Sequence, residues 1–347
     1  MNKLRFTFAI LLAIVSIVSV PLTASAASNS IGVNPRRDYT VKSGDTVKDT
    51  IVVNNLNKNE ALTVDVQLID FSGKDESGSP ELLLKRTEPT RWSLKPYLTI
   101  AKDVSIPAGK SVEVPFSIAI PKELGAGSYY SAIKYSSTGE AGSNNVNLTS
   151  SAASLIFVRV PGEAKDELIL EKFGAFNPDA SGPSGTFSTF FGSTTPKYLA
   201  YRLTNKGNVA EQPVGSIELK NMFGKQVKLF EDANPAKNIV LIDQTRRFDV
   251  CLNGEKTTRN DPETGRKIEE NKCNTMSLSP GRYTANLALI YGDNGSSQRQ
   301  LGAVVSFWYL PLWSVIVFVV ALALVAAAIW FTVRKISNSG KGYRTRR

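Results

Sequence analysis

The sequence predicts an all-β protein made of two β-sandwich domains followed by a single C-terminal transmembrane helix. Short runs of alternating apolar and polar residues recur along most of the chain, separated by Gly, Pro, Asn and Asp. Between the two terminal apolar segments, no stretch keeps a helical period. One long apolar segment without charge lies near the C-terminus and matches a bilayer in length.

The N-terminus has the pattern of an export signal over residues 1–26. Lys3 and Arg5 precede an apolar stretch, and Ala24-Ser25-Ala26 forms a small-residue cleavage site of the A-x-A type. We place the cleavage after Ala26. An uncleaved N-terminal anchor is the alternative, and the helix-breaking Pro21 favours cleavage.

The apolar segment over residues 310–333 predicts the transmembrane helix. It carries no charge, and aromatic residues gather at both of its ends, among them Trp313 and Trp330. A buried core helix is the alternative, but such a helix would need a polar face. Residues 334–347 form a basic tail without an acid. The positive-inside rule therefore predicts a single-pass protein of the cell membrane with an extracytoplasmic body and a cytoplasmic tail.

The net charge of +10 invites a nucleic-acid interpretation, but the location of the charge argues against it. Six basic residues lie in the tail, and Lys3 and Arg5 lie in the signal. Without these eight, 33 basic residues face 31 acidic ones, so the exported body is almost neutral. We expect no nucleic-acid partner, and the charge reports membrane topology instead.

The first domain is predicted over residues 30–160. Thr46–Asn54 and Ala61–Phe71 alternate apolar and polar residues, which is typical of half-buried strands. The adjacent Tyr129 and Tyr130 must point to opposite faces, so only one can lie in the core. A polar loop is expected over Lys74–Pro80. Further strands are predicted at Val104–Ile106, Val112–Ile120, Tyr129–Ser136 and Ala152–Val160.

The second domain is predicted over residues 165–306. The Gly-, Ser-, Pro- and Thr-rich stretch Asn177–Pro196 is expected to be a long surface loop. Its strands are expected at Leu168–Phe173, Tyr198–Asn205, Gly215–Lys220, Gln226–Leu229, Ile239–Ile242, Arg247–Leu252, Arg282–Tyr291 and Leu301–Phe307.

Two short motifs occur in both halves. An Asn-containing turn follows a strand at Asn54-Asn55 and again at Thr204-Asn205, and a Gly-x-Tyr motif starts a strand at Gly127 and again at Gly281. The spacing of about 150 residues predicts two copies of one immunoglobulin-like plan.

Cys251 and Cys273 are the two cysteines of the chain, and both lie in the exported body. Their location favours one disulfide, with two free buried thiols as the alternative. The chain has no histidine, which excludes His-based triads, and two sulfurs alone do not complete a zinc site. We therefore expect no metal, no cofactor and no catalytic residues. A carboxylate-based glycosidase using Asp75 and Glu76 is a remote alternative to solvated charge.

The binding candidates are aromatic and cationic residues in a Pro-bounded segment of the first domain: Arg91, Trp92, Lys95 and Tyr97. Aromatic faces beside cations suit sugars and acidic wall polymers, while a tryptophan packed in the core is the alternative. The pairs Arg36-Arg37 and Arg246-Arg247 are interpreted as solvated charge at strand edges.

Several segments resemble a known family. These are SIGVNP at residues 30–35, GDTVKDTIVVNN at 44–55, IPAGKSVEVPF at 106–116, LIFVRVPG at 155–162, NKGNVAEQPVGSI at 205–217 and GRYTANL at 281–287. They are similar to segments of the WxL-interacting proteins of Gram-positive-type bacteria. The resemblance implies a peptidoglycan-binding first domain, a second domain that contacts a surface protein, and a membrane helix with a basic tail. It does not include the cysteine pair or the charged insert 255–272.

The expected function is that of a membrane-anchored binding protein of the bacterial cell envelope. Its partners would be a cell-wall glycan or wall polymer, a surface protein, and the lipid bilayer through one helix. The alternative is an adhesin or assembly chaperone that pairs its strand edges with partner strands.

Overall fold

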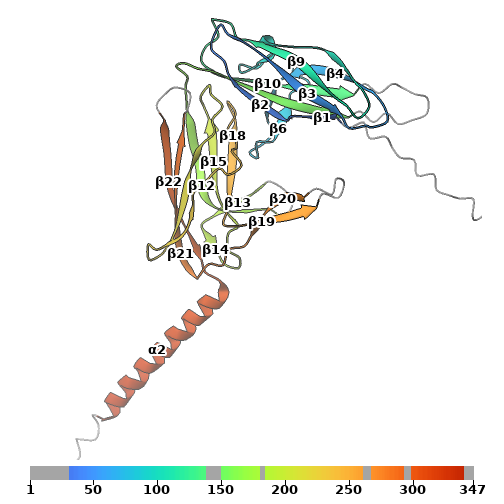
Figure 1. Cartoon of the computed structure of the whole chain (residues 1–347). Coiled ribbons are helices and arrows are strands. Elements are labelled where there is room, and N and C mark those ends of the chain that lie inside the picture. The colour runs from blue at the N-terminus through green and yellow to red at the C-terminus, as the bar shows by residue number, and fades with distance from the viewer. Residues whose placement is uncertain (1–30, 138–149, 180–183, 261–266, 293–297, 340–347) are drawn as a thin grey trace, which may run out of the picture.

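The computed structural model describes residues 31–137, 150–179, 184–260, 267–292 and 298–339. The expected signal and the Ala26 cleavage site lie outside these residues. The described residues form two β-sandwiches and one α-helix, as the sequence predicts, together with a short 3-10 helix at Lys95–Tyr97. The strands of the first domain run across the direction of those in the second (Figure 1).

The first domain is a sandwich of a four-stranded sheet, in the order β1-β3-β9-β7, and a five-stranded sheet, in the order β2-β11-β10-β4-β8. A small hairpin, β5-β6, extends from it. The strands are β1 (Ile31–Val33), β2 (Arg36–Thr40), β3 (Thr46–Asn55), β4 (Leu62–Ile69), β5 (Phe71–Gly73), β6 (Pro80–Leu82), β7 (Leu98–Ile100), β8 (Asp103–Ile106), β9 (Ser111–Ala119), β10 (Gly127–Ser137) and β11 (Ser151–Val160).

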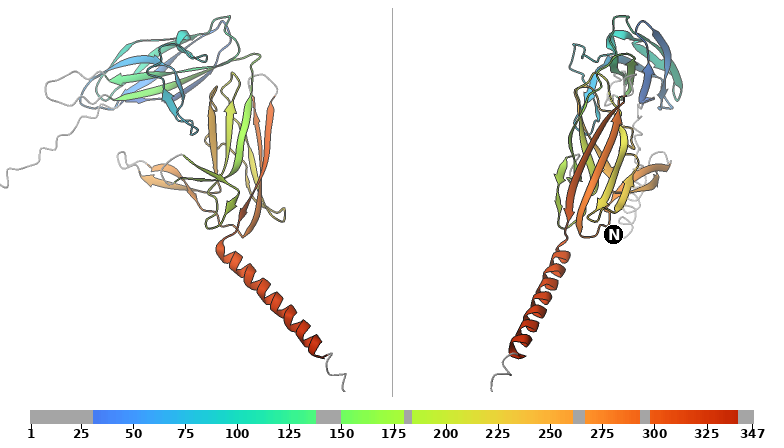
Figure 2. Two further views of the ribbon diagram at one scale, coloured as in Figure 1. Left: turned by 180° about the vertical axis from the view of Figure 1, so that it is seen from behind. Right: turned by 90° about the vertical axis from the view of Figure 1, so that its left-hand side faces the viewer.

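The second domain pairs a four-stranded sheet, in the order β13-β12-β15-β18, with a five-stranded sheet, in the order β14-β22-β21-β16-β17. A separate hairpin, β19-β20, projects from its side (Figure 2). The strands are β12 (Leu168–Pro178), β13 (Gly185–Ser188), β14 (Phe190–Phe191), β15 (Tyr198–Asn205), β16 (Val214–Asn221), β17 (Gln226–Phe230), β18 (Thr245–Cys251), β19 (Asn253–Asn260), β20 (Lys267–Asn274), β21 (Gly281–Tyr291) and β22 (Arg299–Tyr309).

The two sandwiches follow one plan. In each, the first strand pairs with another strand of the four-stranded sheet, β1 with β3 and β12 with β15. The last two strands form an antiparallel pair within the five-stranded sheet. An early short strand crosses over and pairs in parallel with the last strand: β2 with β11, and β14 with β22. The other strand pairs given by the register are antiparallel, as in immunoglobulin-like sandwiches.

A buried asparagine explains the first repeated motif. The Asn55 side chain donates to the carbonyls of Glu60 and Ile106, at 2.8 and 3.2 Å, and accepts from the N–H of Asn57. Asn205 donates to the carbonyls of Val209 and Val240, at 2.6 and 3.0 Å, and accepts from the N–H of Gly207. Each amide therefore closes the turn at the end of its strand, β3 or β15, and satisfies carbonyls that would otherwise be buried without a partner.

The second repeated motif starts the central strand. Gly127 and Gly281 have φ angles of 151° and 152°, which a side chain would disfavour. The tyrosine two residues later points its hydroxyl back to a carbonyl four residues upstream, Tyr129 to Gly125 at 3.0 Å and Tyr283 to Ser279 at 2.8 Å. This geometry is the tyrosine corner of immunoglobulin-like domains.

Two predicted elements are wrong. Ile239–Ile242 is not a strand, because it makes one isolated bridge, between Glu211 and Val240, and then turns through Asp243 at a φ angle of 59°. The stretch Asn177–Pro196 is not a continuous loop. It contains β13 and β14, because Thr186–Ser188 and Phe190-Phe191 pair with neighbouring strands despite the surrounding turn residues.

The predicted disulfide between Cys251 and Cys273 is confirmed, with a Cα–Cα distance of 5.7 Å. The cysteines lie at the base of the β19-β20 hairpin, which the sequence did not predict. Asn253 faces Asn274 in its register, so the disulfide closes the hairpin at the point where it leaves the second domain.

Helix α2 (Leu312–Ser339) begins two residues later than predicted and continues six residues further. Its segment Leu312–Ile336 is long and apolar enough to cross a membrane, and none of its hydrophobic window is buried against the protein. It leaves from the end of the second domain that is far from the first domain (Figure 1).

An apolar cluster joins the two domains. Phe71 and Tyr130 of the first domain are buried with Leu241 and Ile242 of the second. Tyr130 thus points out of its own sandwich and is covered by the other domain, while Tyr129 packs against the core of the first. As predicted, only one of the two adjacent tyrosines faces that core.

The loop after β15 completes the junction. The carbonyl of Asn208 accepts from the N–H of Ser128 at 2.9 Å, and its side chain donates to the carbonyl of Ala126 at 3.0 Å. A Cβ on Gly127 would lie only 2.8 Å from the Asn208 carbonyl oxygen, so this contact requires a glycine.

Candidate functional site

The four predicted ligand residues do not form one site. Trp92 stacks on Tyr130 with ring centroids 5.8 Å apart and donates from Nε1 to the carbonyl of Phe71 at 3.4 Å. It therefore belongs to the apolar cluster between the domains. Tyr97 packs edge-on against Tyr129, with ring centroids 6.4 Å apart. Both rings serve packing in this structure, which corresponds to the alternative of a structural tryptophan.

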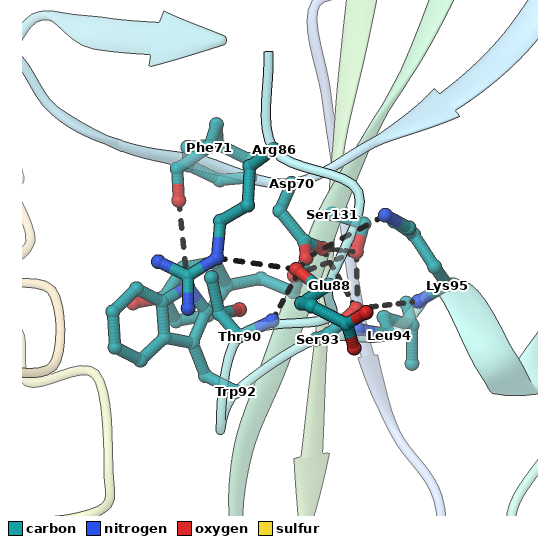
Figure 3. Close-up of polar contacts among 11 residues, drawn as sticks. Asp70, Phe71, Arg86, Glu88, Thr90, Trp92, Ser93, Leu94, Lys95 and Ser131 are labelled. Carbon is teal, nitrogen blue, oxygen red and sulfur yellow. Dashed lines mark hydrogen bonds and ion pairs between the residues drawn. The ribbon is translucent and has the colours of Figure 1, made fainter. Parts of the chain in front are cut away.

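Buried Asp70 organises the segment that carries these residues. Its carboxylate accepts from the hydroxyls of Ser93 at 2.7 Å and Ser131 at 2.8 Å and from the N–H of Thr90 at 3.0 Å. Lys95 lies 3.9 Å away and compensates the buried charge. Figure 3 shows Trp92 and Lys95 on opposite sides of Asp70. The hydrogen bonds of Asp70 thus fix a segment that places Trp92 against the second domain and Lys95 on another face.

Arg91 also belongs to the domain junction. Its guanidinium pairs with Asp243 of the second domain at 2.7 Å. A second ion pair across the junction joins Glu76 to Arg202 at 2.7 Å, and the carbonyl of Glu76 accepts from the N–H of Arg247. Both ion pairs are partly exposed and contribute orientation more than stability.

These contacts also bear on the glycosidase alternative. Glu76 is held by an arginine, and hydrogen bonds from Ser77 keep the pKa of exposed Asp75 below its usual range. A general acid needs a raised pKa and an opposing carboxylate across the substrate. The lowered pKa of Asp75 is opposite to what such an acid needs.

A groove on the first domain is lined by charged residues and has a volume of about 800 Å³. It lies along β4 where the edges of the two sheets separate, between β4 and β7. Its apolar floor includes Leu68, Leu98 and Ile100, and the exposed Leu84 stands at its rim. We call this feature the cationic groove.

Four cations and one acid line the cationic groove. The cations are Arg86, Lys95, Lys102 and Lys134, and the acid is Asp65, which accepts a hydrogen bond from Gln67 at 2.7 Å. Lys95 is partly neutralised by Asp70. Among the described residues, the other three cations have no ion-pair partner. An anion entering the groove would therefore meet positive charge that the protein does not compensate.

A second hollow, of about 440 Å³, lies at the domain junction. Glu211 is buried at its edge and accepts from the N–H of Gly292 at 3.1 Å. Burial, and then the hydrogen bond and charge of neighbouring Asp166, raise the pKa of Glu211 to about 7. Opposite it, the Arg36 guanidinium lies over the Phe157 ring and pairs with Asp38. Because Arg36 and Asp38 already pair and Glu211 is an acid, this hollow fits a junction better than an anion site.

Three edge strands of the described sheets are protected against pairing with another chain. The β2 edge carries the Arg36–Asp38 pair, the β18 edge donates a backbone N–H to the carbonyl of Glu76, and Lys228 on the β17 edge donates to the carbonyl of Leu252. By contrast, Gln67–Ile69 of β4 has an open side. On the side away from β10, its pairing with β8 ends at Asp65, so these residues border the cationic groove.

Sequence reasoning found one cation of the groove, Lys95, and missed Arg86, Lys102 and Lys134. These three lie in separate segments, and no local pattern relates them. Lys134 could have been noticed as a charge in the middle of an apolar central strand, where it faces Gln67 of β4.

No protein-family model matches the sequence, and no curated protein matches it. Solved structures share a similar fold at low similarity. A chaperone–tip adhesin complex of CFA/I fimbriae biogenesis is 12% identical, covers 80% of this chain and 98% of the other, and has a TM-score of 0.37. The class 5 fimbriae chaperone CfaA is 13% identical, with 80% and 99% covered and a TM-score of 0.36. The Salmonella enterica SafA pilin–SafB chaperone complex is 9% identical, with 80% and 96% covered and a TM-score of 0.36. No residue or role is transferred from them.

Proposed function

We propose that this chain is a membrane-anchored binding protein of the bacterial cell envelope that holds an anionic wall polymer in the cationic groove of its first domain. The uncompensated charge of Arg86, Lys102 and Lys134 over an apolar floor carries the proposal. Lysine ammonium groups bind phosphate or carboxylate as point charges, and the floor suits the carbon-rich faces of sugars or polyols.

The arrangement of the domains fits this role. Strand β22 has 11 residues and runs to Tyr309, three residues before helix α2. At about 3.4 Å per residue, the second domain raises the first by roughly 35 Å above the start of the helix. The cationic groove would then face the wall while the chain stays in the membrane. The Cys251–Cys273 disulfide agrees with an oxidising, extracytoplasmic location for the body.

Binding at one groove would be weak, because exposed charge pairs contribute about 0.2–1 kcal/mol each. A repeating polymer offers many equivalent anions, and the membrane anchor keeps the groove at a high local concentration near the wall. Retention would thus come from many weak contacts. We keep the resemblance to WxL-interacting proteins, with their peptidoglycan-binding first domain, as part of this proposal.

The test is retention of the purified protein on isolated walls, with and without their anionic polymers. We expect Lys102→Glu combined with Lys134→Glu to weaken retention roughly tenfold or more, because two favourable contacts become repulsive. Lys42→Glu combined with Lys110→Glu changes the same charge on exposed positions outside the groove. Equal retention of both double variants, or full retention on stripped walls, would contradict the proposal.

A second candidate is recognition of an extended protein segment, as an adhesin or assembly chaperone would require. It is favoured by the unpaired side of Gln67–Ile69, to which a strand could be added. The cations at the same groove would select an acidic segment. This candidate predicts co-purification of a secreted protein that survives removal of the wall polymers, whereas polymer binding predicts retention without any protein partner.

A further inference from the structure

The end of the second domain next to helix α2 carries exposed apolar side chains that no packing within the protein explains. Phe223 is 83% exposed, Met222 and Phe190 are each 56% exposed, and Trp308 is 42% exposed. We call these four residues the apolar rim. Exposed groups of this kind mark contact with a partner or a membrane.

The strand register places the apolar rim at the level where the chain enters the helix. Asn221 faces Tyr283, and Tyr283 faces Phe307, so Phe223 lies two residues beyond that level, close to Gly281 and Tyr309. A Cβ on Gly281 would lie 3.1 Å from the sulfur of Met222. On the other side of β22, Phe190 pairs with Trp308.

The helix follows this end of the domain without a flexible linker. The N–H of Leu310 donates to the carbonyl of Phe191 at 2.9 Å, and α2 begins at Leu312. Figures 1 and 2 show the helix leaving directly from the ends of the long strands. If the helix crosses a bilayer, the apolar rim must therefore lie at the bilayer surface.

The turn that carries Phe223 is built to hold it outward. The Asn221 side chain accepts from the N–H groups of Phe223 and Lys225, both at 3.0 Å, and Gly224 takes a φ angle of 76°. Such a turn is ordered by its own hydrogen bonds. Because the turn is already ordered, Phe223 can contact a partner with little further loss of backbone conformational entropy.

Charge at the same end suits anionic headgroups. Lys225 is exposed in the same turn as Phe223, and exposed Arg282 faces Trp308 across β21 and β22. Lysines beside aromatic rings are typical of proteins that rest on an anionic membrane surface.

We infer that the apolar rim inserts into the interfacial layer of the bilayer around helix α2, so that the second domain stands on the membrane at a defined orientation instead of swinging on its anchor. The occupant of this surface is the lipid interface, and the basic residues beside it contact anionic headgroups. This inference rests on the membrane anchor in the proposed function but not on the cationic groove.

The experiment uses the full chain in nanodiscs of phosphatidylcholine and phosphatidylglycerol, with the native disulfide kept oxidised. Three variants each carry one environment-sensitive fluorophore on a new cysteine: Phe223→Cys in the apolar rim, Leu324→Cys within the helix, and Leu56→Cys as an exposed apolar control in the first domain. Lipids with brominated chains quench fluorophores that reach the bilayer.

We expect quenching and a blue shift at positions 223 and 324 and neither effect at position 56. Adding Lys225→Glu should reduce quenching at position 223 in discs with phosphatidylglycerol and leave position 324 unchanged. Quenching at 324 with none at 223 would overturn the inference while leaving the anchor intact. No quenching at 324 would overturn the anchor and this inference together. Retention on walls, measured with the same protein, tests binding at the cationic groove independently of the apolar rim.

Discussion

The two sandwiches share a plan and differ in what their outer faces contact. Both use a buried asparagine at the end of β3 or β15 and a Gly-x-Tyr corner at the central strand. The first domain leaves a seam open between β4 and β7, and cations line it. The second domain presents apolar and polar contacts to the first at one end and an apolar rim at the other.

This difference separates the residues that define the fold from those that define the role. The repeated residues close turns and satisfy backbone groups, so they occur at equivalent positions in both copies. The groove cations and the rim aromatics have no counterpart in the other copy. The proposed binding surfaces are therefore features that one domain has and the other lacks.

The largest expected effect tests whether the two copies are equivalent. Asn205→Ala and Asn55→Ala should each lower the stability of their own domain by about 3–5 kcal/mol, because buried carbonyls and an N–H lose their partners. Chemical unfolding with a probe in each domain measures this. A large loss of stability in one variant and a negligible loss in the other would show that Asn55 and Asn205 are not equivalent. The exposed Asn59→Ala serves as the control.

The disulfide should stabilise only the second domain. Cys251→Ser combined with Cys273→Ser removes a cross-link between residues separated by 22 positions and should cost about 3 kcal/mol. Calorimetry should show a lower transition temperature for the second domain and an unchanged one for the first. If the first domain shifted equally, the domains would unfold as one unit.

Glu211 should make the domain junction sensitive to pH. Its folded pKa of about 7 lies above the ordinary value of 4.5, so the folded state binds more protons than the unfolded state between these values. Stability should therefore fall as pH rises from about 4.5 to 7. Glu211→Gln should remove this dependence and stabilise the protein at pH 8 by roughly 2 kcal/mol. The exposed Glu113→Gln should keep the wild-type pH profile, and an unchanged profile in Glu211→Gln would sink the prediction.

The smallest expected effect compares the two tyrosine corners. Tyr283→Phe should cost about 1 kcal/mol, because its hydroxyl bond to Ser279 is partly buried. Tyr129→Phe should cost less, because the bond to Gly125 is exposed to water. Thermal unfolding of both variants shows which loses more stability. A larger loss in Tyr129→Phe than in Tyr283→Phe would contradict the prediction.

The sequence predicted the strands well where one face is buried and the other is wet. β3, β4 and β9 alternate between buried and exposed residues over most of their length, and their bounds follow the predicted ones within a residue or two. The prediction failed at Ile239–Ile242, where Leu241 and Ile242 are buried against the first domain while Val240 packs into the core of the second. A local pattern reports that a residue is buried but does not report what covers it.

Of the candidate site, only Lys95 was predicted from the sequence. Trp92 and Arg91 were chosen because aromatic and cationic residues without an evident strand partner suggest a ligand site. Their partners, Tyr130 and Asp243, lie 38 and 152 residues away in the sequence. Burial by a distant domain gives no local signal, so a packing residue and a binding residue look the same in the sequence.

The sequence by itself determined the all-β class, the repeat of one sandwich plan, the disulfide and the apolar helix, because each depends on periodicity, spacing or composition along a short stretch. Only the tertiary structure decided which charges stand together. Arg86, Lys102 and Lys134 meet because β4, β7 and β10 are brought together by long-range packing, and Phe223 reaches the level of the membrane helix through the register of three strands. Contacts of this kind are set by the folded core and not by neighbours in the chain.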